Sequence, residues 1–279
     1  MEILHKIPKL RWVPVRHWYD ISNLMRLRTT VRDPADGKLY RFQCDAFESY
    51  QRARSFLGKE PETIEWLRNS LRPDDVFLDI GANIGIFSLF AAMHLDDNGH
   101  VYACEPHLPN ATQVLQNAAL NGLENRLSVL SIAASGEDGY FPFHYKRWGE
   151  GASGSQLAIE GNPALAATRS IGVEMKCGMT VDSMVEKGII RRPNLIKIDT
   201  DGIEIPIVRG MERLLRSSER PRSLLIEIQP GEYDVQVDFM RSCGYALKEN
   251  HFSGKPKRQF ERGVPLRELA FNGLFEPTQ

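Results

Sequence analysis

The apolar positions in the centre of the chain follow two alternating periods. Short apolar runs of the buried-strand type lie at residues 76–80, 100–105, 127–132, 195–199 and 224–228. Between several of them, apolar residues recur at the three- and four-residue spacing of a helix face, as at Ile203 and Ile207. Strands that alternate with helices in this way predict right-handed crossovers and a doubly wound, mostly parallel sheet.

The flanking segments have other patterns. Residues 33–37 form a strong turn signal between two β-prone runs, which predicts a hairpin within an N-terminal accessory region, residues 1–58. Residues 61–71 have the spacing of an amphipathic helix. Two apolar runs, 245–247 and 269–275, have no strong helical pattern between them. We expect them to complete a seven-stranded sheet as an antiparallel C-terminal pair within a main domain that spans residues 59–279.

Residues 139–180 interrupt the alternation and are rich in Gly, Ala and Ser. A connection this long inside a domain is usually functional, so we expect a lid over the site, with 149–155 as its most flexible part. Its start carries Phe143, Tyr145 and Trp148. These rings would suit stacking on a sugar or attachment of the lid to the core.

Composition narrows the classes of partner. The 279 residues have a net charge of −1, which argues against nucleic acid as a partner. A basic stretch at Lys255, Lys257, Arg258 and Arg262 is expected to be a solvated loop, with a phosphate or membrane contact as the alternative. No apolar run is long enough to span a bilayer, and the four cysteines form no C-x-x-C pair. We therefore expect a soluble protein of the cytoplasm.

Ligands of an open parallel sheet bind at the carboxyl ends of its strands. The polar residues at these ends are Asp79, Glu105, Ser135, Asp199, Asp201, Glu204, Glu227 and Gln229. In the turn after the first strand, Gly81 and Gly85 would let the backbone approach a ligand, and the next helix offers free N–H groups to a carboxylate. Glu105 follows at the distance expected of a ribose-binding acid. Asn83 stands where a dinucleotide-binding turn has its second glycine, which argues against a pyrophosphate.

These motifs together resemble the FkbM family of S-adenosylmethionine-dependent methyltransferases. The resemblance rests on "DIGANIG" at residues 79–85, "EP" at 105–106, "IKIDTDGIE" at 196–204, Gly210 and the strand that ends at Glu227. It covers residues 40–275. It implies a class I methyltransferase fold, S-adenosylmethionine as donor, and O-methylation of a sugar, glycan or natural-product hydroxyl. Where the family often has "KIDVEG", this chain has Thr200 and Asp201.

The resemblance also implies roles for individual residues. Asp79 and the turn amides, including those of Gly81, Asn83 and Gly85, would hold the amino acid part of the donor. Glu105 would hold the ribose and the Ser135 region would lie beside the adenine, with Asp199 near the methyl group. The transfer needs an aligned hydroxyl and a group that takes its proton. The candidates for that group are Asp199, Asp201, Glu204 and, from the lid, His144, with His251 as a further histidine.

Three alternatives stay open at this point. Lys197 is read as a buried partner of one of the acids rather than as a base. Asp199 and Glu227 end neighbouring strands, and their oxygens would also suit Mg²⁺. A nicotinamide-dependent oxidoreductase or a non-catalytic nucleotide-binding module could use the same sheet. The sequence leaves the acceptor and the oligomeric state undetermined.

Overall fold

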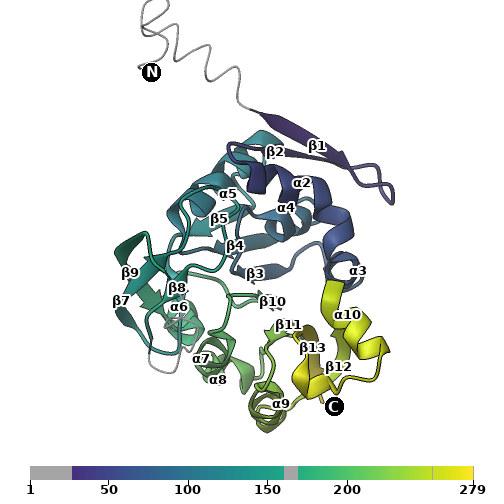
Figure 1. Ribbon diagram of the computed structural model, residues 1–279, viewed down its shortest axis with the longest axis vertical. Coiled ribbons are helices and arrows are strands. Elements are labelled where there is room, and N and C mark those ends of the chain that lie inside the picture. The colour runs from purple at the N-terminus through teal and green to yellow at the C-terminus, as the bar shows by residue number, and fades with distance from the viewer. Residues whose placement is uncertain (1–26, 160–168, 253, 279) are drawn as a thin grey trace, which may run out of the picture.

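The computed structural model describes residues 27–159, 169–252 and 254–278 (Figure 1). Its main sheet has seven strands in the order β12-β13-β11-β10-β3-β4-β5. They are β3 (Val76–Ile80), β4 (His100–Cys104), β5 (Leu127–Leu130), β10 (Leu195–Ile198), β11 (Ser223–Ile228), β12 (Tyr245–His251) and β13 (Phe271–Pro277). Only β13 runs against its neighbours. The predicted seven-stranded, doubly wound fold is confirmed, and its strand order reverses between β3 and β10.

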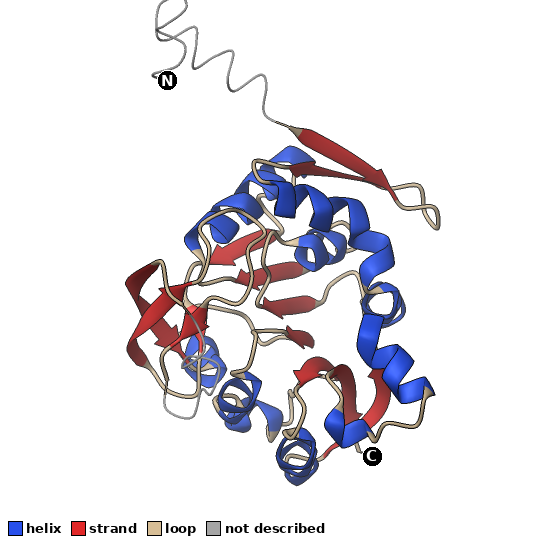
Figure 2. Ribbon diagram, viewed as in Figure 1, coloured by secondary structure: helices blue, strands red, loops and turns tan. Residues whose placement is uncertain are grey.

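Helices cover both faces of this sheet (Figure 2). One face packs against α2 (Phe47–Lys59), α3 (Pro61–Ser70), α4 (Ile86–Ala92) and α5 (Leu108–Asn121). The other packs against α6 (Val181–Glu186), α7 (Glu204–Arg209), α8 (Glu212–Leu215) and α9 (Tyr233–Ser242). The apolar side chains of each strand alternate between the two cores, as for Phe77 and Leu78.

The apolar stripe from Ile203 to Leu214 does not form one helix. It is divided into α7 and α8 at Gly210, which ends α7. A Cβ atom at Gly210 would lie 2.5 Å from the backbone oxygen of Ser135, so the chain packs too closely there for any larger residue. Periodicity alone does not reveal this break.

The predicted N-terminal hairpin is present as β1 (Arg28–Arg32) and β2 (Leu39–Gln43), paired antiparallel. Strand β2 is held against α5, since Asn117 Oδ1 accepts from the backbone N–H of Gln43 at 2.8 Å. Helix α2, which our reading of the sequence missed, follows the hairpin. Its Phe56 is fully buried and contacts the rings of Tyr40, Phe42 and Phe90. Residues 28–59 therefore share one core with the helices of the main sheet.

The segment expected as a lid is largely β-structure. A second sheet has the order β6-β9-β7-β8, with β6 (Ala133–Ala134), β7 (Gly139–Tyr145), β8 (Gln156–Leu157) and β9 (Gly172–Met179). Strand alternation on β7 buries Phe143 and Tyr145, whereas Tyr140 is exposed. Phe143 and Tyr145 thus attach the segment to the core, whereas Trp148 is 59% exposed and packs on the ring of Tyr145.

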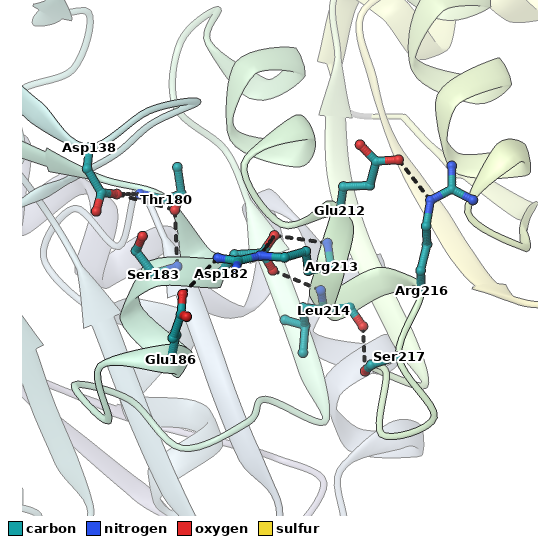
Figure 3. A network of polar contacts seen from close by, with 10 residues as sticks. All are labelled: Asp138, Thr180, Asp182, Ser183, Glu186, Glu212, Arg213, Leu214, Arg216 and Ser217. Atoms are coloured by element: carbon teal, nitrogen blue, oxygen red, sulfur yellow. Dashed lines mark hydrogen bonds and ion pairs between the residues drawn. The ribbon is translucent and has the colours of Figure 1, made fainter.

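A polar network joins one end of this second sheet, at Asp138 and Thr180, to α6 and α8 (Figure 3). Asp138 Oδ1 accepts from the backbone N–H of Thr180, and Thr180 Oγ1 accepts from Ser183 N at the start of α6. Asp182 then accepts the backbone N–H groups of Arg213 and Leu214, which caps α8. One carboxylate from α6 therefore satisfies the free N-terminal amides of another helix.

A helix also occupies the stretch between β12 and β13, where no strong helix was expected. Helix α10 (Gly254–Glu261) and the 3₁₀ turn η4 (Leu266–Glu268) lie there, and α10 has no buried residue. Ring contact between Phe252 and Phe260 attaches it. Because it buries so little, α10 has no apolar stripe that a sequence pattern could reveal. The basic stretch is thus helical rather than a loop. Within the described ranges, no helix has the length and apolar character needed to cross a bilayer.

We expect Phe56→Ala to lower the free energy of unfolding by about 3–5 kcal/mol, because it removes a ring from a packed aromatic cluster. Phe47→Ala on the same helix is the control, since Phe47 is 68% exposed. Chemical denaturation of both variants measures the effect. A loss below about 1 kcal/mol for Phe56→Ala would show that α2 is not part of the core.

Candidate functional site

A pocket opens at the carboxyl ends of the parallel strands, where the strand order reverses. It encloses about 290 Å³, which is at the lower end of small-molecule sites. Its walls come from the turn after β3, the start of α5, the ends of β10 and β11, helix α2, and residues 152–155 of the second sheet's long connection. This is the edge of the sheet at which the sequence predicts ligand binding.

The turn from β3 to α4 is built on two glycines with left-handed backbones, at φ +78° for Gly81 and +79° for Gly85. A Cβ atom on Gly81 would lie 1.8 Å from the backbone oxygen of Asp199, and one on Gly85 would lie 2.9 Å from Val114. The sequence suggested that these glycines make room for a ligand. In the structure Gly81 lines the pocket and also lets the backbone of Asp199 at the end of β10 lie against the turn, whereas Gly85 makes room for Val114 on α5.

Glu105 lies at the end of β4 and faces the pocket. Its Oε2 accepts from Asn83 N at 2.7 Å, and its Oε1 accepts from His107 N at 2.9 Å. Burial raises its pKa to about 7 even though these bonds favour the charged form. A carboxylate has about four lone-pair sites, so beyond these two bonds and a contact from the Asn110 side chain Glu105 can still accept from a ligand hydroxyl.

Asp79 lies behind the pocket wall and is not part of its lining. It is fully buried, its Oδ2 accepts from Ser88 Oγ at 2.6 Å, and its Oδ1 has no partner among the described residues. Burial raises its pKa, while Lys197, opposite it on β10, acts in the other direction. Asp79 therefore supports the turn from behind, and its expected contact with the donor stays a prediction.

Asp199 projects into the pocket from the end of β10. Burial alone would raise its pKa, but Lys197 outweighs that effect and holds the pKa below its usual range. The Lys197 Nζ lies 3.0 Å from Asp199 Oδ2 and 5.0 Å from the centre of the Phe87 ring, and Lys197 is 2% exposed. Lys197 is thus the buried partner of an acid that the sequence favoured.

The other two predicted acids do not share this position. Asp201 lines the pocket, with a left-handed φ of 59°, and its Oδ2 accepts from Gly154 N at 2.7 Å. Glu204 is fully buried and lies outside the lining. Its Oε1 accepts from the backbone N–H and the hydroxyl of Thr200 and from Gly202 N, so it shapes the loop after β10.

Ser135 and the two candidate histidines also lie outside the lining. Ser135 Oγ donates to Glu137 O, and its neighbours Ala133 and Ala134 line the pocket instead. His144 follows Phe143 on β7, so strand alternation directs it to the face opposite the one from which Phe143 lines the pocket. His251 Nε2 lies 2.8 Å from Glu249 Oε2 on β12.

Residues 149–155, the covering loop, are tied over the pocket. The Ala152 carbonyl accepts from the side-chain amides of both Asn83 and Asn110, and Asn110 Oδ1 accepts from Gly151 N. Arg52 Nε donates to Gly151 O at 2.8 Å. The stretch that its glycines marked as most flexible is therefore held by several hydrogen bonds. Asn110 and Arg52 were missed because a polar residue within a helix gives no periodic signal.

Further pocket residues come from the ends of β11 and β13. Glu227 and Asn272 lie opposite each other in that pair of strands, and both line the pocket. Burial first, and then the charges of Asp199, Glu204 and Asp201, raise the pKa of Glu227 to about 9. Glu227 was noticed in the sequence as a strand end, but nothing there indicated that it would stay neutral.

His107 is a pocket residue that the sequence did not suggest. It is 2% exposed, its Nε2 lies 2.9 Å from Arg147 O, and its Nδ1 has no partner among the described residues. Because Arg147 O can only accept, Nε2 carries the proton and Nδ1 is an acceptor. Burial lowers the pKa of His107, which favours this neutral form.

The described residues contain no group of three or more His, Cys, Asp or Glu side chains arranged to hold a metal ion. Asp199 is paired with Lys197 instead. The structure therefore gives no support to the Mg²⁺ alternative.

Comparison with known proteins decides the family. Residues 79–247 match the methyltransferase FkbM domain, which is more than half of the chain. The chain belongs to the FkbM family of methyltransferases. Membership implies S-adenosylmethionine as the methyl donor, as expected from the motifs.

Two named relatives of the FkbM family are similar over most of the chain. Hexuronic acid methyltransferase AglP of Haloferax volcanii is 26% identical over an alignment of 237 residues, and the match covers 83% of this chain and 85% of that protein. The 31-O-demethyl-FK506 methyltransferase FkbM of Streptomyces tacrolimicus is 30% identical over an alignment of 201 residues, and the match covers 63% of this chain and 75% of that protein.

A solved FkbM methyltransferase from Methylobacillus flagellatus KT is more distant. It has a TM-score of 0.45 and 16% identity to this chain. The match covers 83% of this chain but only 55% of that one, so we draw no conclusion about function from it.

We expect Gly81→Ala to be far more damaging than Gly122→Ala. Both positions have a left-handed backbone, but a Cβ atom meets nothing within 4 Å at Gly122 and meets Asp199 at Gly81. Gly122→Ala should cost about 1–2 kcal/mol from the backbone alone. Thermal and chemical unfolding of the two variants compares them. Equal losses of stability would contradict the contact between β3 and β10.

Proposed function

We propose that the chain transfers a methyl group from S-adenosylmethionine to a hydroxyl group of a sugar or another natural product. One observation carries this proposal. The glycine turn after β3, Glu105 and Asp199 line a single pocket under the covering loop. A donor-binding edge and an ionised carboxylate thus face the same space.

The residues present fit the donor. Glu105 has free lone pairs toward the pocket and suits the two ribose hydroxyls. Ala133 and Ala134, with small side chains, leave a flat wall beside it that suits an adenine ring. The turn amides at the start of α4 suit the donor's carboxylate. When bound, S-adenosylmethionine supplies an electrophilic methyl group on a sulfonium sulfur.

We assign the ends of β10 and β11 to the methyl acceptor and call this part of the pocket the acceptor end. Its two carboxyl groups, Asp199 and Glu227, have opposite protonation states. Asp199 is ionised because Lys197 lowers its pKa, and Glu227 is neutral near pH 7 because burial and its acidic neighbours raise its pKa to about 9. Such divergence separates a proton acceptor from a hydrogen-bond donor. Asp199 would take the proton of the reacting hydroxyl, and Glu227 with Asn272 would hold the acceptor in line.

The two relatives support the acceptor class. The name of AglP gives a hexuronic acid as its substrate, and that of FkbM gives 31-O-demethyl-FK506. A hydroxyl on a small or glycan-bound acceptor is consistent with both. The alternative of a nicotinamide-dependent oxidoreductase is disfavoured because Asn83 takes the place of the second glycine of a pyrophosphate-binding turn.

Titration calorimetry tests the donor assignment. We expect S-adenosylhomocysteine to bind in the micromolar range and NADH not to bind, because the pocket has a ribose acid but no pyrophosphate turn. Glu105→Ala should weaken S-adenosylhomocysteine by about tenfold or more. Asp199→Asn should leave binding intact and abolish transfer of a labelled methyl group to hexuronic acids. A correctly folded protein that binds NADH instead would overturn the proposal. Donor binding without methyl transfer to any hydroxyl tested, together with a function that Asp199→Asn leaves unchanged, would favour the non-catalytic module.

We expect Glu227→Gln to stabilise the protein increasingly as pH rises. Folding raises the pKa of Glu227 above its unfolded value, so between about pH 4.5 and pH 9 the native state holds a proton that the unfolded state lacks. Stability contributed by this group therefore falls with pH in that window, and Gln removes the dependence. The advantage of the variant should grow by at least about 1 kcal/mol from pH 5 to pH 9. Chemical denaturation of the variant and the unaltered protein at pH 5 and pH 9 measures the effect. An equal difference in unfolding free energy at both pH values would show that Glu227 is ionised in the fold.

A further inference from the structure

Helix α2 presents two cations to the pocket. Arg52 and Lys59 are seven residues apart, which is two helical turns, and both line the pocket, whereas Arg54 is exposed on another face of the same helix. Neither was singled out by the sequence pattern, and neither has a part in the donor assignment above. They lie toward the acceptor end, because their charges act on Asp199.

The hydrogen-bonding capacity of both cations is largely unused. Arg52 Nε donates to the Gly151 carbonyl. The two terminal Nη atoms of Arg52 make no hydrogen bond or ion pair with the described residues. Lys59 Nζ lies 3.8 Å from Glu60 Oε1, which is too long for a hydrogen bond, and the side chain is 52% exposed. A guanidinium with two free terminal nitrogens matches the two oxygens of a carboxylate.

Most acids of the pocket have other partners. The exception is Glu60, which also lines the pocket and forms an ion pair with Lys59 at 3.8 Å. Asp199 is paired with Lys197 at 3.0 Å, Asp201 accepts from Gly154 N, and Glu105 accepts from two backbone amides. Glu227, with its pKa near 9, adds no negative charge at neutral pH. The acceptor end therefore has cations available for an anion, together with Asp199, Glu227 and Asn272 for hydroxyl groups.

We propose that Arg52 and Lys59 form a carboxylate subsite and that the acceptor is a sugar acid of the uronic acid class. The proposal rests on the proposed methyl transfer and specifies its substrate. The carboxylate of the acceptor lies against α2, and its hydroxyls face the ends of β10, β11 and β13. Neutral sugars lack the first of these contacts. The donor also has a carboxylate, which is the competing occupant of the same two cations.

The test uses the full chain saturated with S-adenosylhomocysteine, titrated with methyl glucopyranosiduronic acid, methyl glucopyranoside and glucose 6-phosphate. We expect the uronic acid to bind at least tenfold more tightly than the other two, and more weakly as salt is added. Lys59→Gln and Arg52→Gln should each remove about tenfold of that affinity. Arg54→Gln is the matched control on the exposed face of α2 and should change nothing.

Other outcomes overturn the proposal in distinguishable ways. Equal binding of the uronic acid and the glucoside removes the carboxylate subsite, and tighter binding of the sugar phosphate assigns the subsite to a different anion. If Lys59→Gln weakens S-adenosylhomocysteine while uronic acid binding persists, the cations hold the donor. Failure of the unaltered chain to bind S-adenosylhomocysteine would instead contradict the proposed methyl transfer. Lys59→Gln is the cleaner variant, because among the described residues Lys59 makes only an exposed ion pair with Glu60, whereas Arg52 also holds the covering loop.

Discussion

The buried ion pair between Lys197 and Asp199 is the interaction on which the site depends. Lys197 lies in the middle of the sheet with Asp79 opposite it on β3 and the ring of Phe87 beside it. A buried ammonium is tolerated only when it is paired, so it keeps both neighbouring carboxylates close. It also holds Asp199 ionised. That charge in turn helps to keep Glu227 neutral one strand away, so one lysine sets the protonation of two pocket residues.

Most of the main sheet was predictable because its strands are short, apolar and separated by helices of ordinary period. The end of each strand then fixed where Glu105, Asp199 and Glu227 lie, since parallel strands end at one edge. The parts that were missed depend on tertiary packing. Helix α2 is defined by Phe56 in an aromatic cluster, and Gly210 breaks a helix because Ser135 lies against it.

The same limit explains the site residues. Sequence spacing placed Asp201 and Glu204 near Asp199, but it could not say that one faces the pocket and the other folds back on its own loop. His144 fits a lid in the sequence, yet strand alternation directs it to the other face of β7. Asn110, Arg52 and Lys59 reach the pocket from helices, where a polar side chain looks like any solvated one. Their role depends on the residues that line the opposite side of the pocket, which only the folded structure shows.

Asn83 connects two parts of the site, the buried acid Glu105 and the covering loop. Its backbone N–H fixes Glu105, and its side-chain amide fixes the Ala152 carbonyl of the covering loop. If Glu105 holds the nucleoside as proposed, lifting the loop would break the side-chain contact of the residue whose backbone orients that acid. Entry and departure of the nucleoside would then be coupled to the cover, and the interval between turnovers would depend on a stretch of chain that takes no part in forming or breaking a bond.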